Sequence, residues 1–266
     1  MKNLQFLKPS LVTLLLFISI TLNCFGQTNA KQEYYELKIY RISQKAQEDR
    51  MDAYLKDVYL PALHRAGISK TGVFKPIETD TASFGKIVYV FIPYKTVDQF
   101  IQLPEVLGKD KVYTEAGKSF LDAPYNDPPF NRYETVLLRA YINMPQFSAP
   151  EFATPASERI YEIRNYESAT EAKAVKKREM FNQGGEIALF KSLNFDAVFY
   201  SEVLIGSNMP NLIYMITFPD MKSHDAKWKS FGESEGWKKL SGMEEYKNTV
   251  SNLHSYLMHP TSYSDF

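Results

Sequence analysis

The chain has 266 residues, with 31 basic and 31 acidic side chains and a formal net charge of zero. This balance excludes the basic surface that a nucleic-acid-binding protein presents, so no nucleic-acid partner is expected. A single cysteine, Cys24, excludes a disulfide within the chain, so the fold must be held by packing.

The first 26 residues predict a signal peptide. Two lysines precede an apolar stretch at 11–22, which is shorter than the roughly 20 residues that span a bilayer. Small residues at Cys24 and Gly26 suit a signal-peptidase site, so we expect cleavage after Gly26 and a periplasmic or secreted protein. A lipoprotein anchored at Cys24 is less favoured, because Asn23 stands where a small residue is typical. No transmembrane span is expected in the mature chain.

The first half predicts alternating strands and helices. Strict alternation of apolar residues indicates strands, and apolar residues three and four apart indicate helices. Pro61 is expected to kink the first helix, and Gly67 to follow its end. The expected elements are strand 34–42, helix 46–66, strands 71–78 and 86–93, helix 96–107 with a helical or irregular continuation to 121, loop 122–129 and strand 133–142.

The second half predicts the same order of elements. Residues 143–157 hold three prolines among small and acidic residues, which indicates a linker between domains at 33–142 and 158–264. The expected elements are strand 159–167, helix 170–191, strands 195–204 and 211–218, helices 221–231 and 234–240, and strand 250–258.

A long internal repeat supports this division. The first strand reads YYELKIY from Tyr34, and the midpoint reads IYEIRNY from Ile160, with the two glutamates 126 positions apart. Each half has the β-α-β-β-α-β order of a ferredoxin-like domain, whose sheet carries helices on one face only. Burying the two open faces against each other predicts an α+β fold, an intramolecular α/β barrel. A barrel closed within one chain would be a monomer or a weak dimer.

The repeated first strands supply the candidate site residues. Side chains alternate along a strand, so each acid, base and tyrosine share one face, which we expect to look into the space between the sheets. They form either structural ion pairs or a cavity for a small polar or carboxylate-bearing ligand. The candidates are Glu36, Lys38, Tyr40, Glu162, Arg164, Tyr166 and, on a neighbouring strand, Glu202.

Other chemistry has little support in the sequence. The four histidines form no metal-binding spacing, and no glycine-rich phosphate loop or nucleophile motif is present, so we expect no metal, cofactor or motif-defined catalytic residue. The segment Asn208–Asn211 reads as a turn. The aromatic residues Trp228, Phe231 and Trp237 are expected to pack in the core.

The second half resembles the NIPSNAP family over nearly all of residues 159–264. The resemblance is carried by YEIRNYES (161–168), MFNQGGEIALF (180–190), VFYSEVLIGSNMPNLIYMITFPD (198–220), WKSF (228–231), GWKKL (236–240) and MHPTSYS (258–264). The first half resembles the family more loosely, through YYELKIY, YLPALHRAGI and VYVFIPY. The resemblance implies a dimeric α/β barrel fold and no general enzymatic mechanism.

Two functional hypotheses follow. The first is a non-catalytic protein that binds a small polar ligand or a protein partner. The alternative is a cofactor-independent monooxygenase or haem-modifying enzyme, since related α/β barrels include both. The resemblance to the haem enzymes implies Asn165 and His224 as candidates, and Tyr214 stands close to where a tryptophan would be needed. The alternation of the strand places Asn165 on the face expected to meet the helices.

Overall fold

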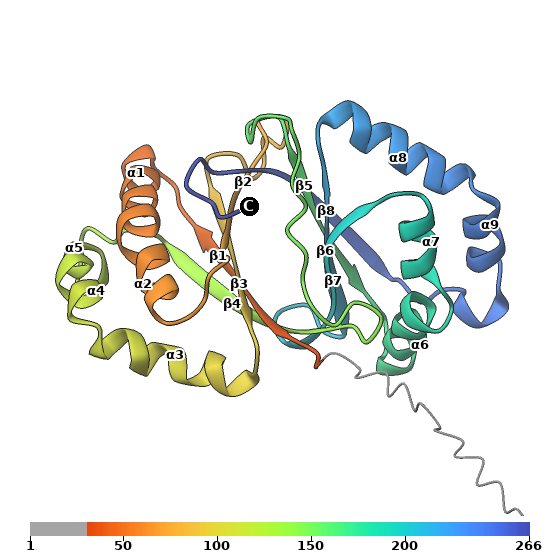
Figure 1. Cartoon of the computed structure of the whole chain (residues 1–266), viewed down its shortest axis with the longest axis horizontal. Helices are drawn as coiled ribbons and strands as arrows, with labels where there is room; N and C mark the ends of the chain where they lie inside the picture. Colours follow the sequence, from red (N-terminus) through yellow and green to blue (C-terminus); the bar gives the residue numbers. More distant parts are fainter. Residues whose placement is uncertain (1–30) are drawn as a thin grey trace, which may run out of the picture.

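The computed structural model describes residues 31–266, so the predicted signal peptide lies outside the described residues. Its eight strands form one closed barrel in which every neighbouring pair is antiparallel, and helices pack outside it (Figure 1). The predicted α+β barrel, built from two β-α-β-β-α-β halves, is confirmed. No helix within the described residues is long and apolar enough to cross a membrane.

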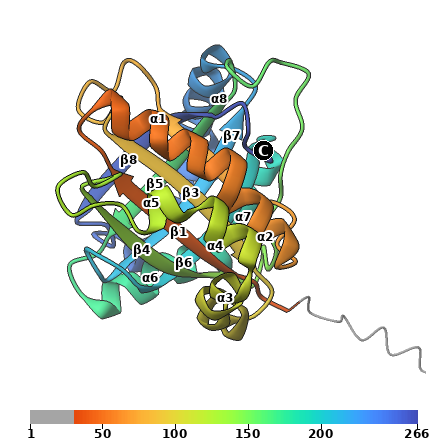
Figure 2. The same cartoon turned by 90° about the vertical axis from the view of Figure 1, so that its left-hand side faces the viewer.

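The first half contributes four strands and five α-helices (Figure 2). A π-helical segment, Leu55–Tyr59, separates α1 from α2 within one continuous helical run, and Pro61 is the second residue of α2, directly after that segment. Gly67 follows with a φ of 86°, as expected for the residue after a helix end. The elements are β1 (Tyr34–Arg41), α1 (Lys45–Tyr54), α2 (Leu60–Arg65), β2 (Gly72–Pro76), β3 (Ile87–Tyr94), α3 (Val97–Lys109), α4 (Lys111–Ala116), α5 (Lys118–Leu121) and β4 (Arg132–Ala140).

The second half repeats this order with one departure from the expectation. The predicted helix 170–191 is two helices, because Gly184 and Gly185 interrupt it and Gly185 has a φ of 89°. The elements are β5 (Ile160–Glu167), α6 (Glu171–Asn182), α7 (Glu186–Ser192), β6 (Asp196–Ile205), β7 (Asn211–Phe218), α8 (Met221–Glu233), α9 (Glu235–Ser241) and β8 (Asn252–Pro260).

Two seams between the halves close the barrel. The strand order is β1-β3-β2-β8-β5-β7-β6-β4, so the fourth strand of each half pairs with the second strand of the other. These pairings are β2 with β8 and β4 with β6. Because each seam satisfies backbone groups that an isolated half would leave at an open sheet edge, the two halves depend on each other.

The inner and outer faces of the strands are the reverse of the prediction. Tyr35, Leu37 and Ile163 belong to the core cluster inside the barrel, whereas Tyr40 and Tyr166 pack in separate clusters beneath the helices. The Glu–Lys/Arg–Tyr face therefore lies under the helices and not in the barrel interior. The physical reason is that a barrel of eight strands is narrow enough for side chains to fill, and apolar rows fill it without unpaired charge.

Aromatic side chains fill one end of the barrel. Rings from both halves meet there, with Phe91 and Phe199 stacked at 4.9 Å between ring centroids. Phe147, from the segment predicted as a linker, and Phe266 pack into the same group at 6.0 Å from each other. We call this group the aromatic plug; its members are Tyr35, Phe74, Phe91, Phe147, Tyr161, Phe199 and Phe266.

The strand register also refines the internal repeat. Tyr35 pairs with Pro93, and its counterpart Tyr161 pairs with Thr217. Pro93 therefore corresponds to Thr217, although the spacing of 126 residues between the two glutamates would match it with Pro219. Tyr94 likewise corresponds to Phe218, which removes a hydroxyl group from the second half.

Candidate functional site

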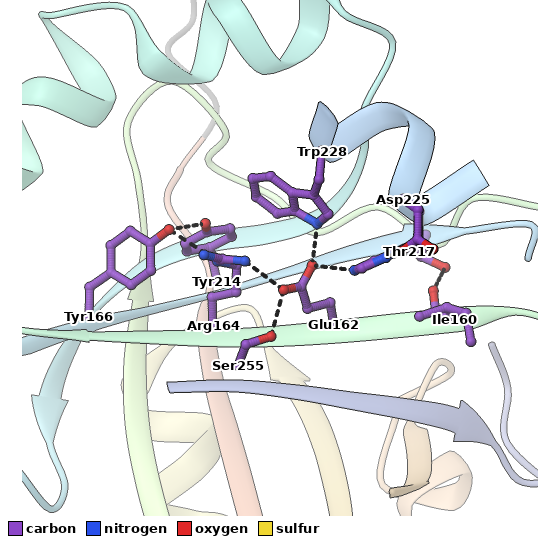
Figure 3. A network of polar contacts seen from close by, with 10 residues as sticks. Ile160, Glu162, Arg164, Tyr166, Tyr214, Thr217, Asp225, Trp228 and Ser255 are labelled. Atoms are coloured by element: carbon purple, nitrogen blue, oxygen red, sulfur yellow. Dashed lines mark hydrogen bonds and ion pairs between the residues drawn. The ribbon is translucent and has the colours of Figure 1, made fainter. Parts of the chain in front are cut away.

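Glu162 is the centre of a buried polar network beneath α8 (Figure 3). Its Oε1 accepts hydrogen bonds from Arg164 Nη1 at 2.7 Å and from Ser255 Oγ at 2.6 Å. Its Oε2 accepts one from Trp228 Nε1 at 2.6 Å and lies 3.4 Å from His224 Nε2. The carboxylate is thus held by groups from β5, β8 and α8, which makes it a tie between the sheet and its covering helix.

The basic side of this network is equally well partnered. Arg164 Nε donates to the hydroxyl of Tyr166 at 3.1 Å, and that hydroxyl is 2.7 Å from the hydroxyl of Tyr214. The guanidinium also lies 4.3 Å from the ring centroid of Trp228, within the range of a cation–π contact. The guanidinium of Arg164 is therefore paired with other side chains of the protein.

The first half holds its glutamate with different donors. Glu36 accepts from the Tyr94 hydroxyl at 2.7 Å and from Thr135 at 3.0 Å, and Lys38 Nζ lies 3.1 Å away. Because Phe218 replaces the tyrosine in the second half, Trp228 of α8 supplies the missing donor there. In both halves the glutamate carboxylate therefore keeps its hydrogen bonds, although the donor differs. This is expected of an ion pair that serves the structure.

Charge pairing shifts the pKa values of Glu162 and His224 in opposite directions. Burial favours the neutral acid, but His224, Arg164 and Ser255 outweigh it and lower the pKa of Glu162 below 4.5. Burial likewise opposes the imidazolium, but Glu162 and Asp225 outweigh it and raise the pKa of His224 above 6.5. Each group stabilises the charged form of the other.

The remaining sequence candidates are dispersed. Glu202 does not join Glu162: its Oε1 accepts from Arg139 Nε at 2.6 Å across the β4–β6 seam, and its Oε2 lies 3.4 Å from Arg178 Nε. Tyr40 is buried against Phe130 in the first half. Each proposed ligand-binding residue thus contacts other side chains of the protein, and a ligand-binding role for these residues stays a prediction.

The three enzyme candidates do not converge. His224 and Tyr214 lie on the outer face of the sheet, in or beside the Glu162 network. Asn165 lies on the inner face, contrary to the expectation, and lines a pocket together with Ile163. A sheet therefore separates Asn165 from His224, which is no arrangement for two groups acting on one substrate. Among residues 31–266, no three His, Cys, Asp or Glu side chains gather as metal ligands.

A pocket opens at the barrel end opposite the aromatic plug. It has a volume of about 240 Å³, and it is formed where β1 and β5 end and where β3, β4 and β7 begin. Its walls combine an aliphatic lining, two tyrosines and a polar side. We call it the mouth pocket; its lining residues are Leu37, Ile39, Arg41, Ile87, Tyr89, Glu134, Val136, Ile163, Asn165, Ser207, Asn208, Asn211, Ile213 and Tyr256.

The polar side of the mouth pocket is one connected chain of contacts. Arg41 Nη2 lies 3.5 Å from Glu134 Oε1, and Ser207 Oγ donates to Glu134 Oε2 at 3.1 Å. Asn211 Nδ2 donates to the Ser207 carbonyl at 3.4 Å and to Asn165 Oδ1 at 2.8 Å. The chain runs from β1 through β4 and the β6–β7 turn to β5, so both halves of the protein build it.

Within this set of polar contacts, the side-chain oxygen of Asn211 has no hydrogen-bond partner. Asn211 is only 3% exposed, and its Oδ1 is fully buried without a hydrogen bond to any described residue. A buried carbonyl oxygen left unpaired is costly, and such atoms in native structures call for an explanation. Asn211 lines the mouth pocket, but this oxygen has almost no accessible surface, so a molecule in the pocket would meet the other polar groups of the wall.

Sequence reasoning missed this pocket. The segment Asn208–Asn211 read as a simple turn, and Arg41 and Glu134 had no visible relation to it. The available signal was a change within the repeat, since Ile39 of the first inner row corresponds to Asn165 in the second. A polar residue in an otherwise apolar inward row marks a position that is not simple core.

Comparison with known proteins agrees with the fold. Residues 161–265 match the family model of NIPSNAP, which confirms the sequence resemblance of the second half to that family. No curated protein matches the chain.

Solved structures with the same fold cover both halves. A candidate monooxygenase from Lactobacillus acidophilus is similar at 9% identity and a TM-score of 0.56, over 86% of this chain and 94% of that chain. One from Fusobacterium nucleatum has 8% identity and a TM-score of 0.55, over 86% and 93%. A NIPSNAP-like domain protein from Burkholderia xenovorans shows 16% identity and a TM-score of 0.37, over 40% of this chain and 89% of its own. At 8–9% identity, the likeness to the two candidate monooxygenases establishes the barrel fold alone.

Proposed function

We propose that this protein is a non-catalytic binding protein that holds a small polar molecule in the mouth pocket. The observation that carries the proposal is a pocket of about 240 Å³ at one end of the barrel, whose wall combines aliphatic side chains with a connected set of polar groups from both halves. A volume just below the usual range of ligand sites, roughly 300–1,000 Å³, suits a small molecule.

The asymmetry of the barrel supports this choice of site. The aromatic plug fills one end with rings in direct contact, whereas the other end combines apolar walls with a few polar groups. Small-molecule sites in proteins have this second composition, and the mouths of barrels are common places for them. By contrast, none of the four described pockets is lined by Glu162 or Arg164, whose polar atoms are already paired.

An oxygenase or haem-modifying activity has less support. The candidate monooxygenases share the fold at 8–9% identity, which does not extend to chemistry. The mouth pocket offers three asparagine amides, three hydroxyl groups and one ion pair, with no histidine or cysteine in its wall. These groups suit recognition through hydrogen bonds.

The proposal is tested by native against denaturing mass spectrometry of residues 27–266. We expect a mass surplus that disappears on denaturation. Ile39→Trp should abolish it, because Ile39 lines the pocket and a larger ring would fill the space. Ile101→Trp is the matched control, since Ile101 is 64% exposed on α3, outside the mouth pocket.

Either of two results would overturn the proposal. One is a native mass equal to the bare chain after purification from several growth conditions, together with no binding in a metabolite screen. The other is a surplus that Ile39→Trp leaves unchanged, which would move the ligand to another part of the molecule.

We further propose that the protein acts outside the cytoplasm. The support is the sequence pattern of residues 1–26, with its lysines, short apolar stretch and small residues before Gln27. The intact mass of the chain from a periplasmic extract would test this. A chain that starts at Gln27 agrees with the proposal, and a full-length chain found only in the cytoplasm contradicts it.

A further inference from the structure

The wall of the mouth pocket points to the chemical class of its ligand. We infer that the ligand is an apolar α-amino acid in its zwitterionic form, with its ammonium and carboxylate groups at the open end of the pocket and its side chain inside. This inference rests on the proposed function, because it concerns the same pocket.

Arg41 and Glu134 place two opposite charges side by side in the pocket wall. Both residues line the pocket, and Arg41 Nη2 lies 3.5 Å from Glu134 Oε1. Their side chains are 54% and 35% exposed, so a molecule in the pocket can reach both charged groups. The contact is longer than the roughly 2.7–2.9 Å of a charge-assisted hydrogen bond, so each group keeps capacity for a further partner. Ser207 Oγ holds the other oxygen of Glu134 at 3.1 Å, which fixes the carboxylate in this position.

The strand register places these charges at the outer end of the pocket. Along β1 the inward-facing row is Leu37, Ile39 and then Arg41, the last residue of the strand. On β4, Glu134 stands opposite Ile39, and the next inward residue, Val136, lies deeper in the barrel. The pocket is therefore polar at its opening and aliphatic toward the barrel interior.

An α-amino acid carries the matching pair of charges. Its ammonium nitrogen and carboxylate carbon are bonded to the same carbon atom and lie about 2.5 Å apart. The carboxylate can therefore meet Arg41 while the ammonium meets Glu134, so that every charge has an opposite charge beside it. A ligand with a single charge is less favoured, because an anion would also face Glu134 and a cation would also face Arg41.

Two phenol hydroxyls lie near this charged pair. Tyr89 and Tyr256 line the same pocket, with their ring centroids 6.1 Å apart. Neither hydroxyl makes a hydrogen bond to residues 31–266, and neither is sealed from solvent as the Asn211 oxygen is. Burial raises the pKa of both tyrosines, so both hydroxyls stay protonated, and the smaller effects of the Arg41 and Glu134 charges show that the pair is close to them. Both hydroxyls are therefore available as donors to a bound molecule.

The aliphatic part of the wall receives the side chain of the ligand. Leu37, Ile39, Ile163 and Ile213 line the pocket from three strands, β1, β5 and β7. Burying an aliphatic side chain against them favours binding, whereas a polar side chain would lose its hydration there without a partner. We therefore expect leucine-like amino acids to bind and amino acids with charged side chains to be rejected.

The test is titration calorimetry of residues 27–266 with L-leucine and two probes that share its carbon skeleton. The probe 4-methylpentanoate lacks the ammonium group, and 3-methylbutylamine lacks the carboxylate. We expect L-leucine to bind at least about tenfold more tightly than either probe, since a site built around a polar group rejects an analogue that lacks it. Equal binding of L-leucine and either probe, or no binding of L-leucine, would overturn the inference.

Two variants assign each charge of the ligand to its partner. Arg41→Met should weaken L-leucine binding at least about tenfold but make 3-methylbutylamine no weaker, because that probe has no carboxylate. Glu134→Gln should likewise weaken L-leucine and spare 4-methylpentanoate. Both side chains belong to an exposed ion pair, so we expect these variants to fold. Arg65→Met is the matched control, since Arg65 of α2 pairs with Asp110 outside the mouth pocket and should leave L-leucine binding unchanged.

The outcomes separate the inference from the proposed function. L-leucine binding that Arg41→Met and Glu134→Gln both leave unchanged would overturn the inference. Failure of L-leucine, combined with a different molecule that native mass spectrometry retains and Ile39→Trp loses, would overturn the inference and keep the proposed function. Absence of any ligand would overturn both. L-leucine binding that is lost in Ile39→Trp and weakened by both charge variants would support both.

Discussion

Glu162→Gln tests whether the buried network under α8 is structural. The Glu162 side chain is 2% exposed and that of Arg164 is 17% exposed, so the substitution leaves a largely buried guanidinium without its counter-ion. Removing one partner of a buried ion pair costs about 3–5 kcal/mol. Because glutamine retains an acceptor oxygen and Arg164 keeps some contact with solvent, we expect about 3 kcal/mol here.

A second substitution identifies the cause of that loss. Arg164→Met in the Glu162→Gln background removes the stranded charge and keeps the side-chain length, so we expect the double variant to regain about 1–2 kcal/mol. Glu134→Gln is the matched control, because its pair with Arg41 is 35% and 54% exposed and exposed pairs contribute less than about 1 kcal/mol.

The assay is urea unfolding followed by far-ultraviolet circular dichroism, with the slope of the transition checked for each variant. A cost below about 1 kcal/mol for Glu162→Gln would refute the structural interpretation. Loss of a bound molecule at unchanged stability would instead support the earlier hypothesis that these residues bind a ligand. An additive double variant would show that Glu162 and Arg164 do not act as a pair.

Three further predictions concern pH, the plug and a helix break. The pKa of His224 in the folded protein is raised above 6.5, so the stability that its charged form contributes is complete below pH 6.5 and is lost as pH rises through the folded-state pKa. His224→Gln should therefore flatten the fall of the unfolding free energy above pH 6.5. An unchanged slope of unfolding free energy against pH would contradict this. Phe266→Ala should cost about 2 kcal/mol in urea unfolding, less than for a fully buried ring, because Phe266 contacts Phe147 but is partly exposed; no loss would show that the plug is closed without it. Gly185→Ala should cost about 1–2 kcal/mol from its φ of 89° alone. Gly184→Ala should cost more, since its Cβ would lie 2.7 Å from a backbone oxygen, and the reverse order of melting temperatures would refute this reasoning.

The sequence by itself determined the elements and the barrel. Apolar periodicity is a local property of the chain, so β1, β5 and β7 were predicted to within a residue or two. The repeat then implied two sheets with open faces, and burying those faces leaves few arrangements. The break at Gly184–Gly185 was missed because the apolar spacing continues through it, and only the positive φ of Gly185 shows where the helix ends.

Only the tertiary structure decided which face of each strand looks inward. Alternation shows that Leu37 and Lys38 point in opposite directions, but both faces of a barrel strand are covered, one by other strands and one by helices. The mouth pocket was likewise hidden, because its polar chain joins Arg41, Glu134 and Asn211 from three distant segments. Such a site arises from strand register and barrel closure, which bring together residues that have no spacing rule along the chain.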